Sequence, residues 1–277
     1  MPCLFSDAIT DEVDLTDISV KEEEINTSAS LIRGVAAKLM EMGYPIEGFD
    51  LYATSNVLKG SGLSSSAAYE VMLGHVMNGL FCGGEISAVD IARIGQYAEN
   101  VYFGKKSGLM DQTASSVGGV VAIDFKDNSA PVVRKLDFSF EKSGYSLCII
   151  DSGADHADLS DEYSAIPTEM KQVAAKLGAE VLREADEKQF MEKLAEIRKE
   201  TGDRAILRAL HFFRENKKAV LEAELLEKGE FEAFLDVVKA SGQSSAMYLQ
   251  NVKVEGQAFH QEVQYALAVC DMLLDGR

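Results

Sequence analysis

The stretch Leu58–Ala68 carries the residues of this chain best suited to binding an anionic ligand. It reads Leu-Lys-Gly-Ser-Gly-Leu-Ser-Ser-Ser-Ala-Ala. Glycine lets backbone N–H groups approach a ligand closely, and the first turn of a helix adds unpaired N–H groups with a partial positive charge. We therefore predict a cradle for the phosphates of a nucleotide, formed by Gly60, Ser61, Gly62, Leu63, Ser64, Ser65 and Ser66.

The same stretch also has a plain structural explanation, which is a glycine turn with serine caps on a buried helix. The elements expected on either side favour the phosphate site. Residues Phe49–Thr54 alternate like a strand, and Ala67–Phe81 is apolar nearly all round, like a buried helix. The stretch is not a Walker A loop, because no Gly-Lys-Ser or Gly-Lys-Thr ends it.

Three segments, in this order along the chain, resemble one family of kinases. Gly60–Ala68 resembles the phosphate-loop motif of the galactokinase, homoserine kinase, mevalonate kinase and phosphomevalonate kinase (GHMP) superfamily. Ala98–Gln112 is similar to the galactokinase block around its catalytic aspartate. Asp158–Tyr163 resembles the segment that bears a sugar-contacting tyrosine in galactokinases. Together the three segments favour galactokinase over the other members.

The resemblance implies roles for individual residues. It implies that Asp111 is the catalytic base, that Ser66 and Glu99 bind Mg²⁺, and that Gly108, Asp111 and Tyr163 contact the sugar. The chemistry suits these types: a carboxylate can accept the proton of a sugar hydroxyl and orient it toward the γ-phosphate of ATP, and Mg²⁺ prefers oxygen ligands. By residue type alone, a helix-capping Asp111, an exposed Glu99 and a packing role for Tyr163 stay open.

The implied activity is that of a sugar 1-kinase that transfers the γ-phosphate of ATP to the anomeric hydroxyl of galactose, with Mg²⁺. The alternatives are another GHMP small-molecule kinase and a galactokinase-like regulator that binds sugar and nucleotide without turnover. The family's Gly-Glu-His-Thr-Asp-Tyr-like segment has no counterpart before Asp50, and its C-terminal glycine-rich motif has none before Arg277. We therefore expect the chain to correspond to the central portion of such a kinase and to be poorly active alone.

Charge and composition restrict the class of partner. The net charge of −18 disfavours nucleic acid and repels ATP at long range, so a nucleotide site must depend on local N–H groups and Mg²⁺. No run of about 18 apolar residues predicts a membrane span. The four cysteines are scattered, and we interpret them as buried free thiols in a reducing cytoplasm. The expected partner is a small sugar, with neither nucleic acid nor a membrane.

Strands followed by helices predict an α+β fold of the GHMP-kinase type. We expect a domain with a mixed sheet and helices over residues 1–152, then a mostly helical domain over residues 153–277. The acidic residues 1–26 are expected to be a solvated surface segment. Helices are predicted from Thr27 or Ser28 to Gly43 and over residues 67–81, 85–103, 158–178, 187–199, 204–228, 230–250 and 257–275. Strands are predicted over residues 49–54, 119–124, 132–138 and 145–151. The second and third are expected to pair across a polar turn at Lys126–Ala130, and the last is expected to be buried. Ser87 can cap the helix predicted over residues 85–103.

Overall fold

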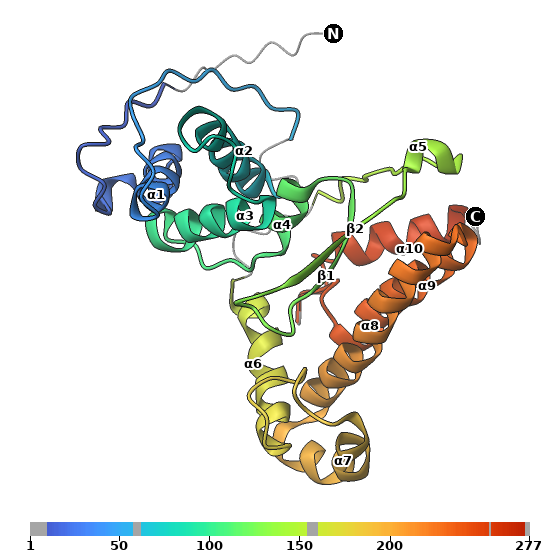
Figure 1. Cartoon of the computed structure of the whole chain (residues 1–277). Coiled ribbons are helices and arrows are strands. Elements are labelled where there is room, and N and C mark those ends of the chain that lie inside the picture. The colour runs from blue at the N-terminus through green and yellow to red at the C-terminus, as the bar shows by residue number, and fades with distance from the viewer. Residues whose placement is uncertain (1–9, 58–61, 154–159, 255, 275–277) are drawn as a thin grey trace. The chain divides into compact units, whose positions relative to one another are not determined.

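The computed structural model describes residues 10–57, 62–153, 160–254 and 256–274, and the chain divides into two compact units (Figure 1). The first unit comprises residues 1–123 and 132–135, and the second comprises residues 124–131 and 136–277. The boundary after residue 152 was predicted for the two domains of a GHMP kinase, and it stays a prediction.

Helices make up most of the first unit. They are η1 (Glu22–Glu24, a 3₁₀ helix), α1 (Ser28–Glu41), α2 (Ser65–Phe81), α3 (Ala88–Tyr97), the π-helix η2 (Ala98–Phe103) and α4 (Met110–Val117). The helix predicted over residues 85–103 is thus α3 continued by η2. Ser87 caps α3 as its residue type predicts, since its side chain accepts a hydrogen bond from the N–H of Asp90 at 3.2 Å.

The core of the first unit is formed by α1, α2 and α3. Leu31, Val35 and Leu39 recur every four residues along α1 and share one buried cluster with Leu73 of α2 and Ile91 of α3. This spacing places the three α1 side chains on one face of the helix. The predicted helices therefore owe their stability to a common apolar core.

Two glycines allow these helices to approach each other closely. A Cβ added at Gly34 would lie 2.8 Å from the Cα of Ala98, and one added at Gly74 would lie 2.7 Å from Cγ2 of Ile91. Both distances are shorter than a carbon–carbon contact allows. The close packing of α1 on η2, and of α2 on α3, therefore requires glycine at these positions.

The described sheet has two strands, β1 (Val120–Asp124) and β2 (Val132–Leu136), which pair as predicted. The strands predicted over residues 49–54 and 145–151 are wrong, because both segments lack regular secondary structure and pair with no described strand. The segment 145–151 is also not buried, and the exposed fractions of Leu147 and Ile150 are 75% and 62%. The α+β class is confirmed, while the described sheet is smaller than the predicted mixed sheet.

The second unit is mostly helical, as expected. Its helices are α5 (Phe140–Ser143), α6 (Ser160–Lys176), α7 (Glu187–Thr201), α8 (Asp203–Lys228), α9 (Phe231–Ser244), the π-helix η3 (Ser245–Leu249) and α10 (Glu262–Leu274). Val173, Phe190, Ile206 and Phe213 contribute to its buried core. Arg208 is buried there, and its Nη1 pairs with Oε2 of Glu169 at 2.9 Å.

The cysteines only partly match the expectation of buried thiols. Cys82 is buried and Cys270 is half-buried, whereas Cys148 is exposed. Cys148 lies in the segment 145–151, so the interpretation of its thiol as buried fails for the same reason as the predicted strand. Cys3 lies outside the described residues.

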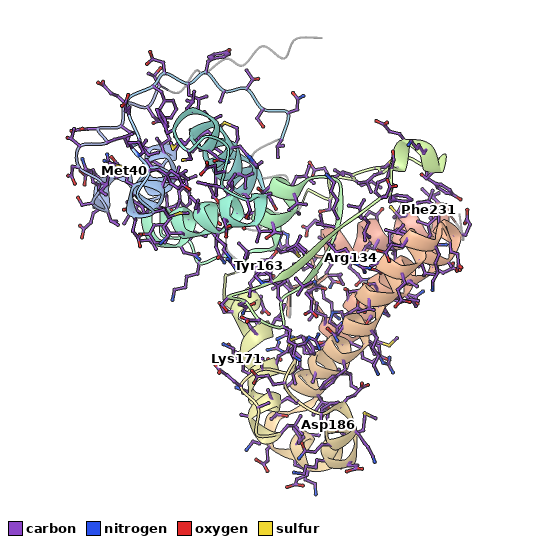
Figure 2. The ribbon with its side chains drawn as sticks, in the orientation of Figure 1. Met40, Arg134, Tyr163, Lys171, Asp186 and Phe231 are labelled. Carbon is purple, nitrogen blue, oxygen red and sulfur yellow. The ribbon has the colours of Figure 1, made fainter. Side chains whose placement is uncertain are left out.

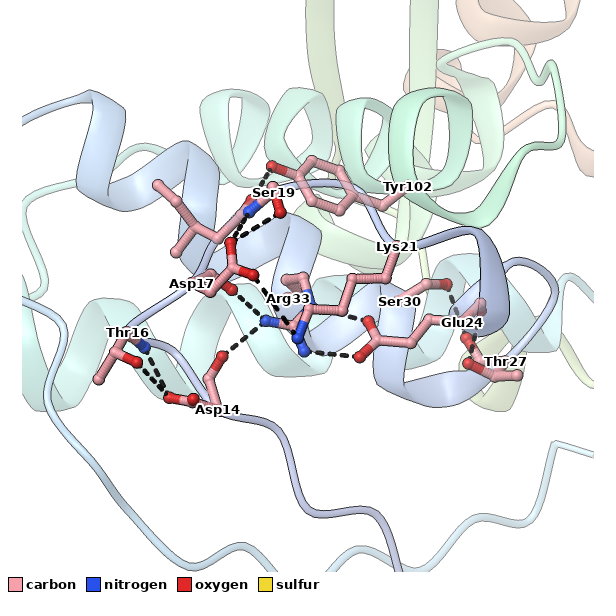
Figure 3. A network of polar contacts seen from close by, with 11 residues as sticks. Asp14, Thr16, Asp17, Ser19, Lys21, Glu24, Thr27, Ser30, Arg33 and Tyr102 are labelled. Carbon is pink, nitrogen blue, oxygen red and sulfur yellow. Dashed lines mark hydrogen bonds and ion pairs between the residues drawn. The ribbon is translucent and has the colours of Figure 1, made fainter.

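The acidic N-terminal segment is docked rather than merely solvated. Arg33 of α1 is 1% exposed, and its Nη1 donates to the backbone oxygens of Asp14, at 2.6 Å, and of Asp17 (Figure 3). Its Nε and Nη2 donate to Oε2 and Oε1 of Glu24 at 2.7 and 2.5 Å. Tyr102 adds a bond from its hydroxyl to the oxygen of Ile18 at 2.7 Å. We call Arg33, Glu24 and the two backbone oxygens the Arg33 clamp.

Candidate active site

The described part of the predicted cradle leads into the first turn of α2, whereas Gly60 and Ser61 lie outside the described residues. Gly62 has a φ of 73°, and Ser64 has a left-handed backbone with φ 57° and ψ 49°. That conformation is uncommon for a residue with a side chain and is often found where function constrains the backbone. Ser64 is the N-cap residue of α2, yet its side chain does not cap the helix. The first-turn N–H groups therefore lack the usual N-cap acceptor.

The hydroxyl of Ser64 is instead bonded to Asp111. Ser64 Oγ donates to Asp111 Oδ2 at 2.6 Å, which joins the start of α2 to the first turn of α4. The N-cap residue of α4 is Leu109, so Asp111 is not the capping residue. Asp111 is exposed, and its carboxylate lies at the surface beside the predicted cradle.

Gly108 lies in the loop that precedes α4, and this loop is anchored to α3 and η2 by two amide side chains. Gln96 Nε2 donates to the oxygen of Ser107 at 3.0 Å, and the N–H of Ser107 donates to Asn100 Oδ1 at 2.7 Å. Gly108 is exposed, and a Cβ added there would meet no atom within 4 Å. The anchored loop holds Gly108 three residues before Asp111.

Glu99 lies on η2, and π-helical turns often occur at functional sites. Its exposed fraction is 1%, so the alternative of an exposed helix carboxylate is wrong. Glu99 Oε1 accepts hydrogen bonds from Ser66 Oγ at 3.0 Å and from Lys105 Nζ at 3.1 Å. The structure thus brings together the two residues predicted to bind Mg²⁺, with a lysine ammonium beside them.

Two further polar residues, which the sequence analysis did not select, are buried next to Glu99. Gln112 Nε2 donates to Glu99 Oε2 at 3.0 Å and to Glu70 Oε2 at 3.2 Å. We call Glu70, Glu99 and Gln112 the acid–amide cluster. Burial, and then the nearby charge of Glu99, raises the pKa of the Glu70 carboxyl to about 8. The signal in the sequence is a carboxyl group on the mostly apolar helix α2, one turn after Ser66.

The oxygen atoms of Ser66 and Glu99 are of the type that Mg²⁺ prefers. Among the described residues, no group of three or more His, Cys, Asp or Glu side chains could hold a metal ion. Mg²⁺ is usually bound in kinases by one or two carboxylates together with substrate phosphates and waters, rather than by a complete cage of protein ligands. One hydroxyl and one carboxylate next to a phosphate cradle therefore fit this cation.

Tyr163 lies on α6 in the second unit, where its exposed fraction is 59% (Figure 2). Its predicted contact with the sugar stays a prediction. Ser64, Ser66, Glu99, Gly108 and Asp111 all belong to the first unit, so the part of the candidate site that these residues form lies within that unit.

Comparison with known families defines the class of this first unit. Residues 30–119 match the family model described as GHMP kinases N terminal domain. That range contains most of α1 and all of α2, α3, η2 and α4, and with them Glu99 and Asp111.

The most similar relatives include several galactokinases. The chain is 34% identical over 220 residues to the galactokinase of Streptomyces coelicolor, covering 76% of this chain and 54% of the relative. It is 34% identical over 227 residues to that of Actinobacillus pleuropneumoniae serotype 3, covering 78% and 56%. The Thermosipho africanus galactokinase is 28% identical over 260 residues, covering 93% and 69%. The chain thus spans about half the length of the first two of these relatives.

A solved structure shows the same fold. The crystal structure of Lactococcus lactis galactokinase complexed with galactose superimposes with a TM-score of 0.65 at 24% identity, covering 87% of this chain and 62% of that chain. The predicted resemblance to galactokinases of the GHMP superfamily is therefore confirmed, and the chain has their fold over most of its length. None of the helices in the described part of the chain has the length and apolar character needed to cross a membrane.

Proposed function

We propose that this chain serves a galactokinase-type reaction, in which the γ-phosphate of ATP is transferred to the anomeric hydroxyl of galactose. The observation that carries the proposal is the pair of hydrogen bonds at the start of α2, from Ser64 to Asp111 and from Ser66 to Glu99. These bonds gather the predicted base and the predicted metal-binding oxygens around one uncapped helix terminus. The galactokinase relatives, and the neighbour that was solved with galactose, support the choice of sugar.

Phosphoryl transfer depends mainly on positioning and on neutralising charge. In the proposal, the N–H groups from Gly60 to Ser66 bind the phosphates. Ser64 holds Oδ2 of Asp111, which leaves Oδ1 to accept the proton of the sugar hydroxyl. Gly108 and Tyr163 contact the sugar. In this arrangement Ser64 belongs to both parts of the site, since it lies in the cradle and orients the base.

The metal side consists of the Ser66 hydroxyl and the Glu99 carboxylate. Bound Mg²⁺ supplies charge neutralisation for the phosphates. The contact of the Lys105 ammonium with Glu99 Oε1, at 3.1 Å, supports a cation at this oxygen. The proposal includes ATP and Mg²⁺ as cofactors, a small sugar as the partner, and the cytoplasm as the location, in keeping with the free thiols of the described cysteines.

The proposal is tested with Asp111→Asn. A general base contributes about 10²–10⁴-fold to the rate, so the variant should phosphorylate galactose at least 10²-fold more slowly under single-turnover conditions, which detect slow reactions. Its melting temperature should hardly move, because Asp111 is exposed and does not cap α4.

The chain offers a matched control in Asp90→Asn. Asp90 lies in the first turn of α3 and accepts from Ser87 Oγ at 2.6 Å, the same contact that Asp111 makes with Ser64. The control should keep the wild-type rate. Normal turnover by Asp111→Asn together with a clear fall in melting temperature would show that Asp111 is structural and would overturn the proposed base.

A further inference from the structure

The acid–amide cluster buries two carboxyl groups around one amide. Glu70, Glu99 and Gln112 are 0%, 1% and 1% exposed. The cation that contacts the cluster is Lys105, whose side chain is 59% exposed. Burial of carboxylates without close compensation is costly, and an apolar core of the same volume would avoid that cost. The cluster therefore calls for an explanation beyond packing.

The hydrogen bonds determine which way the Gln112 amide points. Both of its contacts, with Glu70 Oε2 and with Glu99 Oε2, are to carboxylate oxygens, so the nitrogen with its two hydrogens must face them. Gln112 Oε1 is turned away and has no partner among the described residues. The amide thus acts as a bridge with a defined direction between α2 and η2.

Glu70 is held in place by its neighbours on α3. A Cβ added at Gly95 would lie 3.1 Å from the Cβ of Glu70 and 3.4 Å from its Oε2. The absence of a side chain at Gly95 leaves the space that Glu70 occupies, and little more. Glu70 therefore provides a fixed acceptor from which the amide of Gln112 reaches Glu99.

The bridge determines which oxygen of Glu99 is available. Gln112 occupies Oε2, while Oε1 faces Ser66 and Lys105. A carboxylate whose two oxygens have separate partners cannot rotate without losing bonds on both sides. The geometry of the Ser66–Glu99 pair thus depends on the buried amide of Gln112.

We propose that Gln112, anchored by Glu70, is a positioning residue that directs the Glu99 carboxylate toward the cation at the start of α2. The inference rests on the proposed function, because it assigns a cause to the geometry of that same metal side. It also gives α4 a double role. Asp111 and the adjacent Gln112 lie in the same first turn, so one helix sets both the base against Ser64 and the carboxylate against Ser66.

Metal-dependent nucleotide binding by the 277-residue chain tests this inference without requiring turnover. The probe is a fluorescent N-methylanthraniloyl ADP, titrated with Mg²⁺ and, separately, in EDTA. Gln112→Met keeps the volume of the side chain but removes the amide. In this variant, the Mg²⁺ concentration that gives half of the maximal increase in nucleotide affinity should rise about 10–100-fold, which is the usual cost of losing a group that orients a metal ligand. Affinity for the nucleotide in EDTA should stay unchanged.

Two further variants exclude a loss that is merely structural. Glu70→Gln keeps an acceptor for the Gln112 amide, so its Mg²⁺ response should lie much nearer to wild type than that of Glu70→Met. Asn78→Leu is the matched control, because Asn78 is another buried amide of α2, bonded to the oxygen and N–H of Ile86 at 3.1 and 3.2 Å. Asn78→Leu should lower the melting temperature and leave the Mg²⁺ response unchanged. If Gln112→Met does not fold, Gln112→Asn replaces it, since the shorter amide cannot reach both carboxylates.

A double-mutant comparison separates this inference from the proposed function. If Gln112 acts through Glu99, adding Gln112→Met to Glu99→Gln should produce no further loss of Mg²⁺ affinity. An unchanged Mg²⁺ response in Gln112→Met or its Asn replacement, with a lost response in Glu99→Gln, would overturn the positioning role and leave the metal side intact. Nucleotide binding that ignores Mg²⁺ in the wild-type chain would overturn both.

Discussion

The Arg33 clamp and the acid–amide cluster are two buried polar sites in the same unit, and they differ in how well their charges are matched. In the clamp, four N–H donors of Arg33 meet acceptors, and both oxygens of Glu24 are used. In the cluster, two carboxylates share one amide, and Glu70 Oε1 has no partner among the described residues. One buried site is electrostatically balanced and the other is not.

The difference appears in the pKa values of the carboxyl groups. The hydrogen bond from Arg33 lowers the pKa of Glu24 below its usual value, whereas burial and the charge of Glu99 raise the pKa of Glu70 to about 8. A balanced site stabilises the fold at neutral pH, while an unbalanced one opposes it. Strongly perturbed groups cluster at functional sites, and this cluster lies against the predicted metal side. The Arg33 clamp thus serves the fold, whereas the acid–amide cluster fits the proposed metal side.

The largest expected effect comes from breaking the clamp. Arg33→Met removes the cation from a buried site and leaves Glu24 and the oxygens of Asp14 and Asp17 unpaired. The free energy of unfolding should fall by about 3–5 kcal/mol, measured by urea denaturation. The control is Lys38→Met, which removes a surface pair with Glu41 at 3.0 Å and should cost no more than about 1 kcal/mol. Equal losses in the two variants would contradict the structural role of the clamp.

The imbalance of the cluster should be visible as a dependence of stability on pH. Between its unfolded pKa near 4.5 and its folded pKa of about 8, Glu70 keeps a proton in the folded chain that it has lost in the unfolded chain. Its contribution to stability therefore falls as the pH rises through this window. Between pH 5.5 and pH 8, the free energy of unfolding of Glu70→Gln, measured by urea denaturation, should increase relative to that of wild type by at most about 3 kcal/mol. A stability difference that stays constant with pH would mean that Glu70 ionises normally.

The contact between α1, which carries Arg33, and η2, which carries Glu99, should also be sensitive to the addition of a single methyl group. In Gly34→Ala the new Cβ would lie 2.8 Å from both the Cα and the Cβ of Ala98, so α1 or η2, which carries Glu99, must move. We expect a loss of about 1–3 kcal/mol in the free energy of unfolding. Gly79→Ala in α2 is the control, because a Cβ there meets no atom within 4 Å, and it should stabilise by about 0.5–1 kcal/mol. If both variants changed the free energy of unfolding in the same direction, the close approach of α1 to η2 would be refuted.

The smallest expected effect is a test of the docked N-terminal segment next to the clamp. Tyr102→Phe removes the hydroxyl that donates to the oxygen of Ile18 at 2.7 Å. The cost should be about 0.5–1.5 kcal/mol by urea denaturation. Tyr52→Phe changes a side chain that is 90% exposed and should have no measurable effect. If Tyr102→Phe were equally silent, the hydrogen bond to Ile18 would not contribute to stability.

Local patterns predicted the elements that depend on neighbouring residues. The apolar positions of Ala67–Phe81 predicted most of α2, and Ser87 predicted the start of α3. The alternating residues on either side of a polar turn predicted the β1–β2 pair. The resemblance selected Ser64, Ser66, Glu99 and Asp111, which the structure brings together in pairs. These features depend on residue types and on short spacings along the chain, both of which can be identified in a single sequence.

The features that only the tertiary structure decided join residues distant in sequence. The segments 49–54 and 145–151 were predicted as strands from their own residues, but a strand exists only where another strand supplies its hydrogen bonds. Gln112 meets Glu70 across 42 positions, so neither residue type reveals the bridge. Arg33 is buried against the backbone oxygens of Asp14 and Asp17, and every residue has such an oxygen whatever its side chain. Sequence therefore determined the helices and the reactive side chains, whereas the folding of distant segments onto one another decided which polar groups were buried and which were matched.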